Sequence, residues 1–435
     1  MKAAPAGGWT PRAGYALGFL TLISTFNYLD RSLLGLALPM IKREMGASDT
    51  VMGLVTGFAF VLFYSLLGVP IAWAADRFNR RNIIASGFLF WSLMTALSGF
   101  VANIWQLAVV RFLMGAGEAC GIPPSNAMIA DLVPPRRRPL ALSIFGTAFA
   151  IASIALMPAM GWIAEHRGWR AMFVAAGVPG MLLGIGFLLT VREPPRGATE
   201  SGPADTTPRA SPGAAIGYLL RTRTYCFLLL GVTFLGANVY ATGAWSTTFL
   251  VRVHHMGLAE IATTIGLARG LFGMAGILSG GILIDRLARR DPRWRVRLPA
   301  VACILAGPAE LLFLLADAHP LWVAGLVLSS FLTLIHQAPV YALALDVAPV
   351  RMRATAIAII LFCASLLGQA IGPLFVGMLN DALAPAYGEA AIRYSLIVTA
   401  ATAILGGIAF SLAAPSIDAD VRRARGGHSQ SGAPG

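Results

Sequence analysis

Runs of about 20 apolar residues recur along the whole chain, and this feature constrains the fold more than any other. A helix of about 20 apolar residues is long enough to cross the roughly 30 Å hydrocarbon core of a bilayer. The 435-residue sequence is 57% hydrophobic and only 12% charged, whereas a soluble domain carries about 25% charge. The pattern predicts an all-α membrane protein with twelve spans, at residues 14–38, 50–73, 83–103, 105–131, 139–163, 169–191, 225–250, 258–284, 298–317, 320–346, 354–379 and 391–413.

The formal net charge of +13 raises the question of a nucleic-acid partner. Its distribution indicates membrane topology instead. If the N-terminus lies in the cytoplasm, most of the 33 lysines and arginines fall in cytoplasmic loops or tails, as the positive-inside rule requires. We therefore expect both termini in the cytoplasm and no nucleic-acid partner.

A polar stretch divides the chain into two halves. Residues 192–215 are rich in Pro, Gly, Ser, Thr and Ala, a composition that cannot bury a core. We expect a cytoplasmic linker at 192–222 that ends in a short helix on the membrane surface. The expected domains are an N-terminal six-helix bundle at 1–191, a C-terminal six-helix bundle at 223–414, and a cytoplasmic tail at 415–435.

The two halves carry the same motifs at nearly equal offsets. ADRFNRR at 75–81 corresponds to IDRLARR at 284–290, and Asp131 corresponds to Asp346. Asn27 in the first span likewise corresponds to Asn238 in the seventh. Three motifs in matching places indicate two homologous bundles.

These motifs resemble those of the major facilitator superfamily. ADRFNRR is similar to that family's loop G-x-x-x-D-R-x-x-R-R, and residues 111–117 are similar to its helix-four motif R-x-x-x-G-x-G. The resemblance implies alternating access by two bundles that rock about a central site. Residues 155–161 of the fifth span match the family's antiporter motif poorly, which argues against drug–proton antiport.

The loop motifs predict a latch between bundle ends. Its acids and bases would pair in one state and separate in the other. The alternative is that the arginines only enforce topology. The predicted latch residues are Asp76, Arg77, Arg80, Arg81, Asp131, Asp285 and Arg286.

Four charged residues in the spans belong to the first half alone: Asp30, Arg31, Arg111 and Glu118. A charge at the bilayer centre costs at least ~2.5–3.5 kcal/mol, so such groups face a cavity or one another. Helical rise places Glu118 near the midplane, and Gly115 leaves room there for a substrate or a neighbouring helix.

We expect these four residues to close into a neutral polar network, with either arginine serving either acid. The structural alternative is a static salt-bridge cluster. The functional interpretation is proton coupling by Asp30 and Glu118, with Arg31 and Arg111 completing the network.

NYLDR at 27–31, together with R-x-x-x-G-x-G-E-A at 111–119, Pro123-Pro124 and VREPPR at 191–196, resembles the Spinster branch and its bacterial relatives. The resemblance implies proton coupling at the matching acids, export of sphingolipids or lysophospholipids, and a bacterial inner (plasma) membrane. NYxDR with GxxEA is also similar to the anion–cation symporter branch, which implies uptake of sugar acids and other organic anions.

Further polar side chains in the spans are candidates for substrate binding. Arg269 could bind an anionic head group, or it could pair with Glu310. His336 could carry a proton, although a packing role is the simpler interpretation. The full candidate set is Asn27, Asn238, Tyr240, Trp245, Arg269, Glu310 and His336.

The sequence contains no HExxH, no GxSxG and no clustered His, Cys and acid set, so we expect neither an enzyme nor a metal or cofactor. The predicted partners are a small-molecule or lipid substrate, protons and membrane lipids, and the predicted state is a monomer. A membrane receptor that transports nothing is the alternative class.

Overall fold

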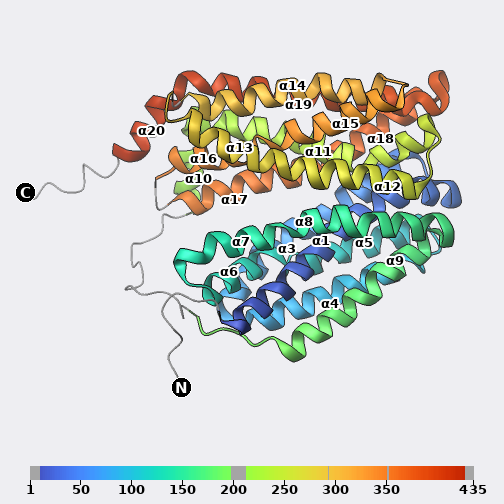
Figure 1. Cartoon of the computed structure of the whole chain (residues 1–435), viewed down its shortest axis with the longest axis horizontal. Coiled ribbons are helices and arrows are strands. Elements are labelled where there is room, and N and C mark those ends of the chain that lie inside the picture. The colour runs from blue at the N-terminus through green and yellow to red at the C-terminus, as the bar shows by residue number, and fades with distance from the viewer. Residues whose placement is uncertain (1–9, 197–211, 292, 350–351, 427–435) are drawn as a thin grey trace, which may run out of the picture. The chain divides into compact units, whose positions relative to one another are not determined.

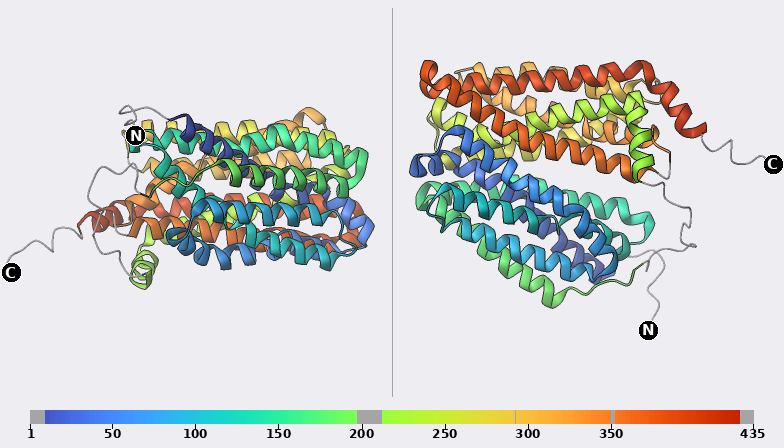
Figure 2. Two further views of the ribbon diagram at one scale, coloured as in Figure 1. Left: turned by 90° about the horizontal axis from the view of Figure 1, so that it is seen from below. Right: turned by 180° about the vertical axis from the view of Figure 1, so that it is seen from behind.

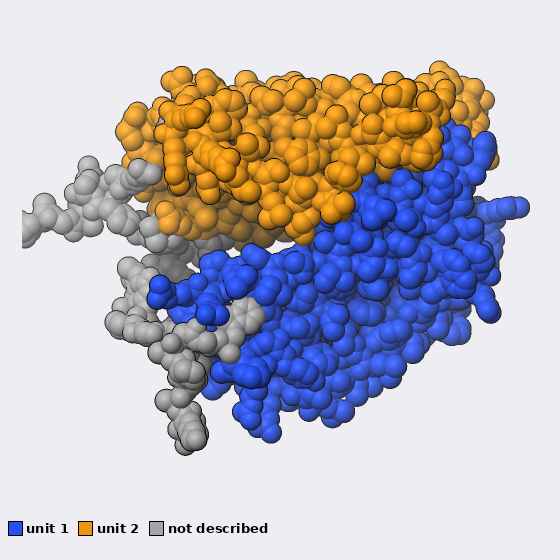
Figure 3. All heavy atoms as spheres, viewed as in Figure 1, with its two compact units in different colours: residues 1–204, 246–270 blue, residues 205–245, 271–435 orange. Residues whose placement is uncertain are grey.

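The computed structural model describes residues 10–196, 212–291, 293–349 and 352–426. Every regular element within these residues is a helix (Figures 1 and 2). The chain divides into two compact units (Figure 3): unit 1 holds residues 1–204 with 246–270, and unit 2 holds residues 205–245 with 271–435. The expected all-α architecture is therefore confirmed for the described residues.

Unit 1 is built from the helices of the first half together with a hairpin from the second half. Its helices are α1 (Pro11–Met45), α2 (Asp49–Thr56), α3 (Phe58–Arg77), α4 (Arg80–Ser98), α5 (Ile104–Glu118), α6 (Ile122–Leu132), η1 (Pro135–Arg137), α7 (Arg138–Gly146), α8 (Ala148–Ile151), η2 (Ala152–Leu156), α9 (Met157–Thr190) and α12 (Leu258–Leu267), with the last turns of α11 and the start of η3.

Unit 2 contains the remaining helices. They are α10 (Pro212–Arg221), α11 (Arg223–His254, up to Trp245), η3 (Ala268–Gly273, from Leu271), α13 (Met274–Leu287), α14 (Trp294–Leu315), α15 (His319–Leu334), α16 (Gln337–Asp346), α17 (Arg353–Phe362), η5 (Cys363–Leu367), α18 (Gly368–Tyr387), η6 (Gly388–Ala390), α19 (Ala391–Ala413), η7 (Ala414–Ser416) and α20 (Ile417–Gly426). Helix α10 lies where the sequence predicts a short helix before the seventh span.

All twelve expected ranges fall mainly on helical residues. In the described residues, seven helical stretches are long and apolar enough to cross a membrane: Asp49–Ala75, Pro135–Thr190, Arg223–His254, Leu258–Leu287, Trp294–Leu315, His319–Asp346 and Thr355–Ala424. The stretch Pro135–Thr190 covers two expected spans. Its chain turns at Gly168, whose φ of 84° suits glycine because a side chain would be strained there.

Glycines allow the helices of unit 1 to approach closely and so fix the position of α5. A Cβ at Gly115 would collide with the carbonyl oxygen of Phe60 on α3, and a Cβ at Gly117 would lie 2.9 Å from the Cβ of Trp91 on α4. Helix α3 therefore fills the space that Gly115 leaves, which is one of the two occupants expected from the sequence. This packing holds Arg111 and Glu118, on the same helix, against α1.

Candidate functional site

Glu118 is the centre of a buried polar cluster in unit 1. Its side chain is fully buried, and its Oε2 accepts hydrogen bonds from Asn27 Nδ2 and Arg31 Nε, each at 2.8 Å. The Arg31 guanidinium also lies over the rings of Phe60 and Tyr64, 5.1 and 4.7 Å from their centroids. The ion pair between Arg31 and Glu118 therefore joins α1 to α5 beside the aromatic residues of α3.

Arg111 and Asp30 complete the cluster, and each is 1% exposed. Arg111 Nη1 contacts the backbone carbonyl of Asp30 at 3.3 Å and the Met114 sulfur at 3.2 Å. The charges around Arg111 are those of Glu118, Asp30 and Arg31. The four charged residues that the sequence singled out are thus brought together, and the cation in direct contact with Glu118 is Arg31.

Several buried polar atoms of this cluster have no hydrogen-bond partner within the described chain. They include Ser24 Oγ, Asn27 Oδ1, Asp30 Oδ1 and Glu118 Oε1. Ser24 and Asn27 line a narrow pocket with Trp91 and Ser125. An unsatisfied buried polar group costs about 1–3 kcal/mol, so these atoms are candidates for contact with a bound solute or water.

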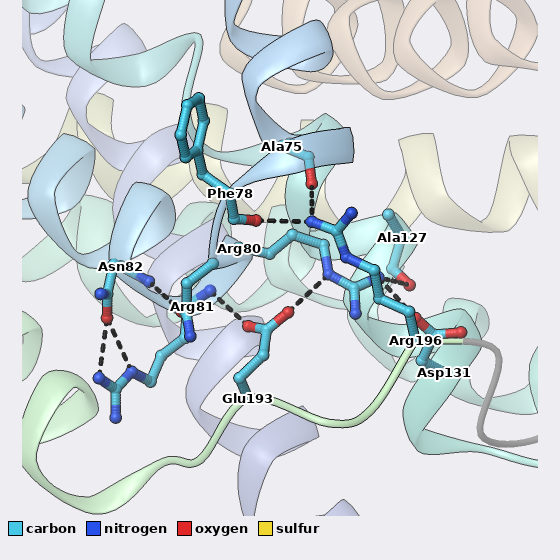
Figure 4. A network of polar contacts seen from close by, with 10 residues as sticks. Ala75, Phe78, Arg80, Arg81, Asn82, Ala127, Asp131, Glu193 and Arg196 are labelled. Atoms are coloured by element: carbon cyan, nitrogen blue, oxygen red, sulfur yellow. Dashed lines mark hydrogen bonds and ion pairs between the residues drawn. The ribbon is translucent and has the colours of Figure 1, made fainter.

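The loop after α3 forms the predicted ion-pair network (Figure 4). Arg80 is only 5% exposed, and it donates from Nη1 to Asp131 Oδ2 at 2.6 Å and from Nε to Glu193 Oε1 at 2.8 Å. The Glu193 Oε2 accepts from the Arg81 backbone at 2.7 Å. Arg77 lies over the Trp73 ring, 3.8 Å from its centroid. The side chain of Asp76 lies outside the described residues.

Sequence reasoning missed Glu193 and Arg196 in this network. Arg196 Nη2 donates to the carbonyl oxygens of Phe78 and Ala75, at 2.7 and 3.0 Å. Both residues belong to VREPPR, which was considered only as a similarity to other proteins. One acid and two bases close to the polar end of a predicted span were the available signal.

The second half repeats the ion pair with a residue that sequence reasoning also missed. Arg295 Nη1 donates to Asp346 Oδ2 at 2.5 Å. Arg295 and Asp346 are 51 residues apart, which is also the separation of Arg80 and Asp131. The predicted latch residues Asp285 and Arg286 are exposed. The loop between α13 and α14 is longer than the loop between α3 and α4. Arg295 therefore makes the ion pair that the comparison of the two motifs would place at 288–290.

A separate ion-pair cluster lies near the end of α1 in unit 1. Asp49 is 3% exposed and accepts from Arg252 Nη1 at 2.8 Å, Arg252 Nη2 at 3.0 Å and Lys42 Nζ at 2.6 Å. Nearby, Glu165 Oε2 accepts from the Ala259 backbone N–H at 2.7 Å, in the first turn of α12. The carboxylates of the first half thus hold the hairpin of the second half.

The candidates for substrate binding in the second half occupy different settings. Arg269 donates to Ser246 Oγ at 2.9 Å in unit 1, whereas Glu310 contacts Asn238 and Thr399 in unit 2. The pairing of Arg269 with Glu310 stays a prediction.

Three further candidates lie in unit 2 and carry hydrogen bonds of their own. Trp245 is fully buried and donates to the Pro373 carbonyl at 2.9 Å, so in this conformation its ring is covered by protein. Tyr240 Oη lies 3.4 Å from Ser365 Oγ. His336 Nδ1 lies 2.5 Å from the Thr333 carbonyl, and its ring stacks on Phe410.

In the described part of the chain, no group of three or more His, Cys, Asp or Glu side chains is arranged to hold a metal ion.

The sequence and the fold have counterparts in known proteins. The model of the Major Facilitator Superfamily matches residues 20–373. An MFS-type efflux pump of Mycolicibacterium smegmatis is 34% identical over 413 residues, which is 94% of each chain. Protein spinster homolog 1 of Homo sapiens is 30% identical, over 95% of this chain and 83% of its own.

A third relative has a different named substrate. The probable galactarate/D-glucarate transporter GudP of Bacillus subtilis is 27% identical, over 75% of this chain and 76% of its own. Among solved structures, a bacterial homologue of the human lysosomal transporter Spinster, in an inward-facing and unoccupied conformation, gives a TM-score of 0.86 at 28% identity. The match covers 95% of this chain and 99% of that one.

Proposed function

Because the chain belongs to the Major Facilitator Superfamily, in its Spinster branch, we propose that it is a proton-coupled secondary transporter that moves a lipid-like amphipathic solute by alternating access. It is an integral, multi-pass membrane transporter and not an enzyme. The proposal includes twelve spanning helices in two six-helix bundles, cytoplasmic termini and a bacterial plasma membrane.

The observation that carries the proposal is the position of Glu118. Its carboxyl is fully buried in the first half and contacts Asn27 and Arg31. A carboxyl in an apolar setting favours the protonated form, while a nearby arginine favours the ionised form. If Arg31 moves away from Glu118 between two states of the transporter, the carboxyl takes up a proton in one state and releases it in the other.

Asp30 and Arg111 support this role because they provide alternative partners in the same cluster. Arg111 contacts the backbone carbonyl of Asp30 and lies on the same helix as Glu118, and Asp30 Oδ1 accepts no hydrogen bond from the described residues. Each acid thus has a second arginine of the cluster nearby as a partner.

Alternating access also needs contacts that break. We assign this role to the Arg80 network at the cytoplasmic side and to the Asp49–Arg252 ion pair at the opposite side. Arg252 comes from the second half of the sequence, yet it is held by an acid of the first half. In an inward-facing state this bond would close the outer entrance, and its release would open it.

The lipid-like substrate rests on similarity to the spinster proteins. The relative named as an efflux pump supports export as the direction of transport. A second candidate is uptake of sugar acids, which the similarity to the galactarate/D-glucarate transporter favours.

The experiment measures proton movement in proteoliposomes with a pH-sensitive dye. Lysolipid and D-glucarate are added separately to the wild type, to Glu118→Gln and to the control Glu389→Gln. Glu389 is exposed, so the control makes the same chemical change outside the cluster. A lysolipid response that is lost in Glu118→Gln and retained in Glu389→Gln is the expected result.

A response to D-glucarate alone would move the protein to the sugar-acid candidate. An equal lysolipid response in Glu118→Gln and in the wild type would remove Glu118 from coupling and leave the static salt bridge as the explanation of the cluster.

A further inference from the structure

Unit 2 contains its own buried carboxyl cluster, built from three helices. Glu310 on α14, Asn238 on α11 and Thr399 on α19 are each 3% exposed. Asn238 Nδ2 donates to Glu310 Oε2 at 2.6 Å and to the Thr399 carbonyl at 2.8 Å. The Thr399 hydroxyl contacts Glu310 Oε1. Asn238 is the repeat counterpart of Asn27, so an equivalent asparagine donates to a buried glutamate in each half.

The hydrogen atoms of this cluster fix which carboxyl oxygen can hold a proton. The amide nitrogen of Asn238 has two hydrogens, and the two oxygens next to it are both acceptors, Glu310 Oε2 and the Thr399 carbonyl. Oε2 therefore receives a hydrogen from Asn238. A proton on the carboxyl group would sit on Oε1, next to the Thr399 hydroxyl.

The Thr399 hydroxyl has one hydrogen and two acceptors within reach. Besides Glu310 Oε1, its oxygen lies 2.5 Å from the Leu396 carbonyl of the same helix. When the hydroxyl donates its hydrogen to Glu310 Oε1, it satisfies the ionised form of the carboxylate. When it donates to Leu396, a hydrogen is needed between Oε1 and the Thr399 oxygen, and a protonated Glu310 supplies it. Rotation of one hydroxyl thus accommodates both states of the carboxyl.

On the helices packed around Glu310, the other ionisable residues lie at a distance from the cluster along each helix. The same helix carries Cys303 two turns away, and His336, the N-cap residue of α16, stacks on Phe410 of α19. The ion pairs of these helices involve residues near their ends: Arg393–Asp317 between α19 and the residues after α14, Arg295–Asp346 between α14 and α16, and Arg297–Asp291 before and within α14. Asn238 and Thr399, which contact the Glu310 carboxyl in unit 2, do not titrate.

We infer that Glu310, with Asn238 and Thr399, forms a second proton-binding site in this transporter, separate from the cluster around Glu118. The inference rests on the proposed function, because it adds a second proton to the coupled cycle. Each half of the protein then has one proton-binding glutamate held by the repeat-related asparagine, and the acids come from non-equivalent helices.

The test reads the carboxyl groups directly, by infrared difference spectroscopy of the full-length protein in lipid at a series of pH values. The wild type is expected to show a protonated-carboxyl band that is lost in Glu310→Gln and retained in Glu118→Gln and in the exposed control Glu389→Gln. Thr399→Val is expected to keep the band and shift its frequency, because the protonated carboxyl loses its acceptor. Thr399→Ser should restore the wild-type frequency.

A second measurement counts protons per solute in proteoliposomes, and we expect the ratio to fall by about half in Glu310→Gln. A band that persists in Glu310→Gln would overturn the inference, and so would its absence from the wild type, which would favour an ionised Glu310. If Glu118→Gln abolishes coupling while Glu310→Gln changes neither band nor ratio, this inference fails and the proposed function stands. If the band is lost in Glu310→Gln while proton-linked flux is unchanged in Glu118→Gln, this inference stands and the proposed role of Glu118 fails. Should Glu310→Gln not fold, the Thr399 variants carry the test.

Discussion

The two halves of this protein share a framework but place it in different surroundings. Arg80–Asp131 and Arg295–Asp346 are equivalent ion pairs. The side chains of the first pair are 6% and 12% exposed, and those of the second are 29% and 27% exposed. Arg80 also contacts a second carboxylate, Glu193, and for Arg295 no second carboxylate is found among the described residues. The duplicated pair is thus a buried network in one half and a single, more solvated contact in the other.

The equivalent asparagines differ in a similar way. Asn27 and Arg31 together hold Glu118, on α5, whereas Asn238 and Thr399 hold Glu310, on α14. Both halves contain the asparagine, while the acid comes from a different helix in each half. Residues of the shared scaffold therefore follow the repeat, and the candidate coupling residues do not.

The largest effect is expected from breaking the two equivalent ion pairs. Removing one partner of a buried ion pair costs about 3–5 kcal/mol, so Arg80→Met should lower thermal stability strongly. An exposed pair contributes only about 0–1 kcal/mol, and the half-buried Arg295–Asp346 pair lies closer to that limit, so Arg295→Met should be milder. Thermal unfolding in one detergent measures both variants. Equal losses of stability would show that burial does not separate the two halves.

The asparagines give the next largest effect. Asn238→Ala removes a donor from two acceptors, Glu310 and the Thr399 carbonyl, and should cost about 2–3 kcal/mol. Asn27→Ala removes a donor from Glu118, which still has Arg31, and should cost about 1–2 kcal/mol. The same unfolding assay applies, with Asn→Asp variants as isosteric partners. A larger loss for Asn27→Ala would contradict the assigned contacts.

The Asp49–Arg252 contact lies in unit 1 and joins segments 203 residues apart in the sequence. Asp49→Asn weakens the hold on Arg252 and should shift the protein toward the outward-open state by up to about tenfold, or ~1.4 kcal/mol. Leu258, buried at the start of α12, reports this change after Leu258→Cys substitution in a background without the native cysteines. Faster labelling by a membrane-impermeant maleimide is the expected result. Unchanged labelling in both Asp49→Asn and Arg252→Gln would exclude a gating role.

The smallest effect concerns Glu44, at the exposed end of α1 beyond the expected span. Hydrogen bonds from Trp169 and Arg170 lower the pKa of Glu44 from its ordinary value of 4.5. Its contribution to stability is therefore present above pH 4.5 and lost as the pH falls through the lowered pKa of the folded state. For an exposed pair we expect only a few tenths of a kcal/mol. Melting curves of the wild type and Glu44→Gln should differ near neutral pH and converge in acid; a constant difference would contradict this.

Much of the fold follows from patterns that are local in the sequence. Apolar runs predict the helices, and the polar linker composition predicts where the first half ends. The Gly168 turn lies where the sequence predicts a boundary between two spans. The unit boundary was harder to predict: residues 246–270 belong to unit 1, because contacts such as that of Arg252 with Asp49 join segments about 200 residues apart and leave no local signal.

Membership of the buried cluster was also predictable, because four charges inside apolar spans are costly and must meet. The pairing was not. From the sequence, either arginine could pair with either acid. The structure brings Arg31 into direct contact with Glu118. The angle between adjacent helical residues is known, but the rotation of α1 about its axis depends on how it packs against α5.

By itself the sequence determined an all-helical membrane protein with a duplicated framework and a charged cluster in one half, because span length, composition and the cost of burying charge are properties of the chain. Only the tertiary structure decided that Arg295 replaces the aligned arginines, that Glu193 joins Arg80, and that Asn238 and Thr399 meet Glu310. These contacts join helices far apart in sequence, and glycine-mediated close packing sets the depth and rotation that bring their side chains together.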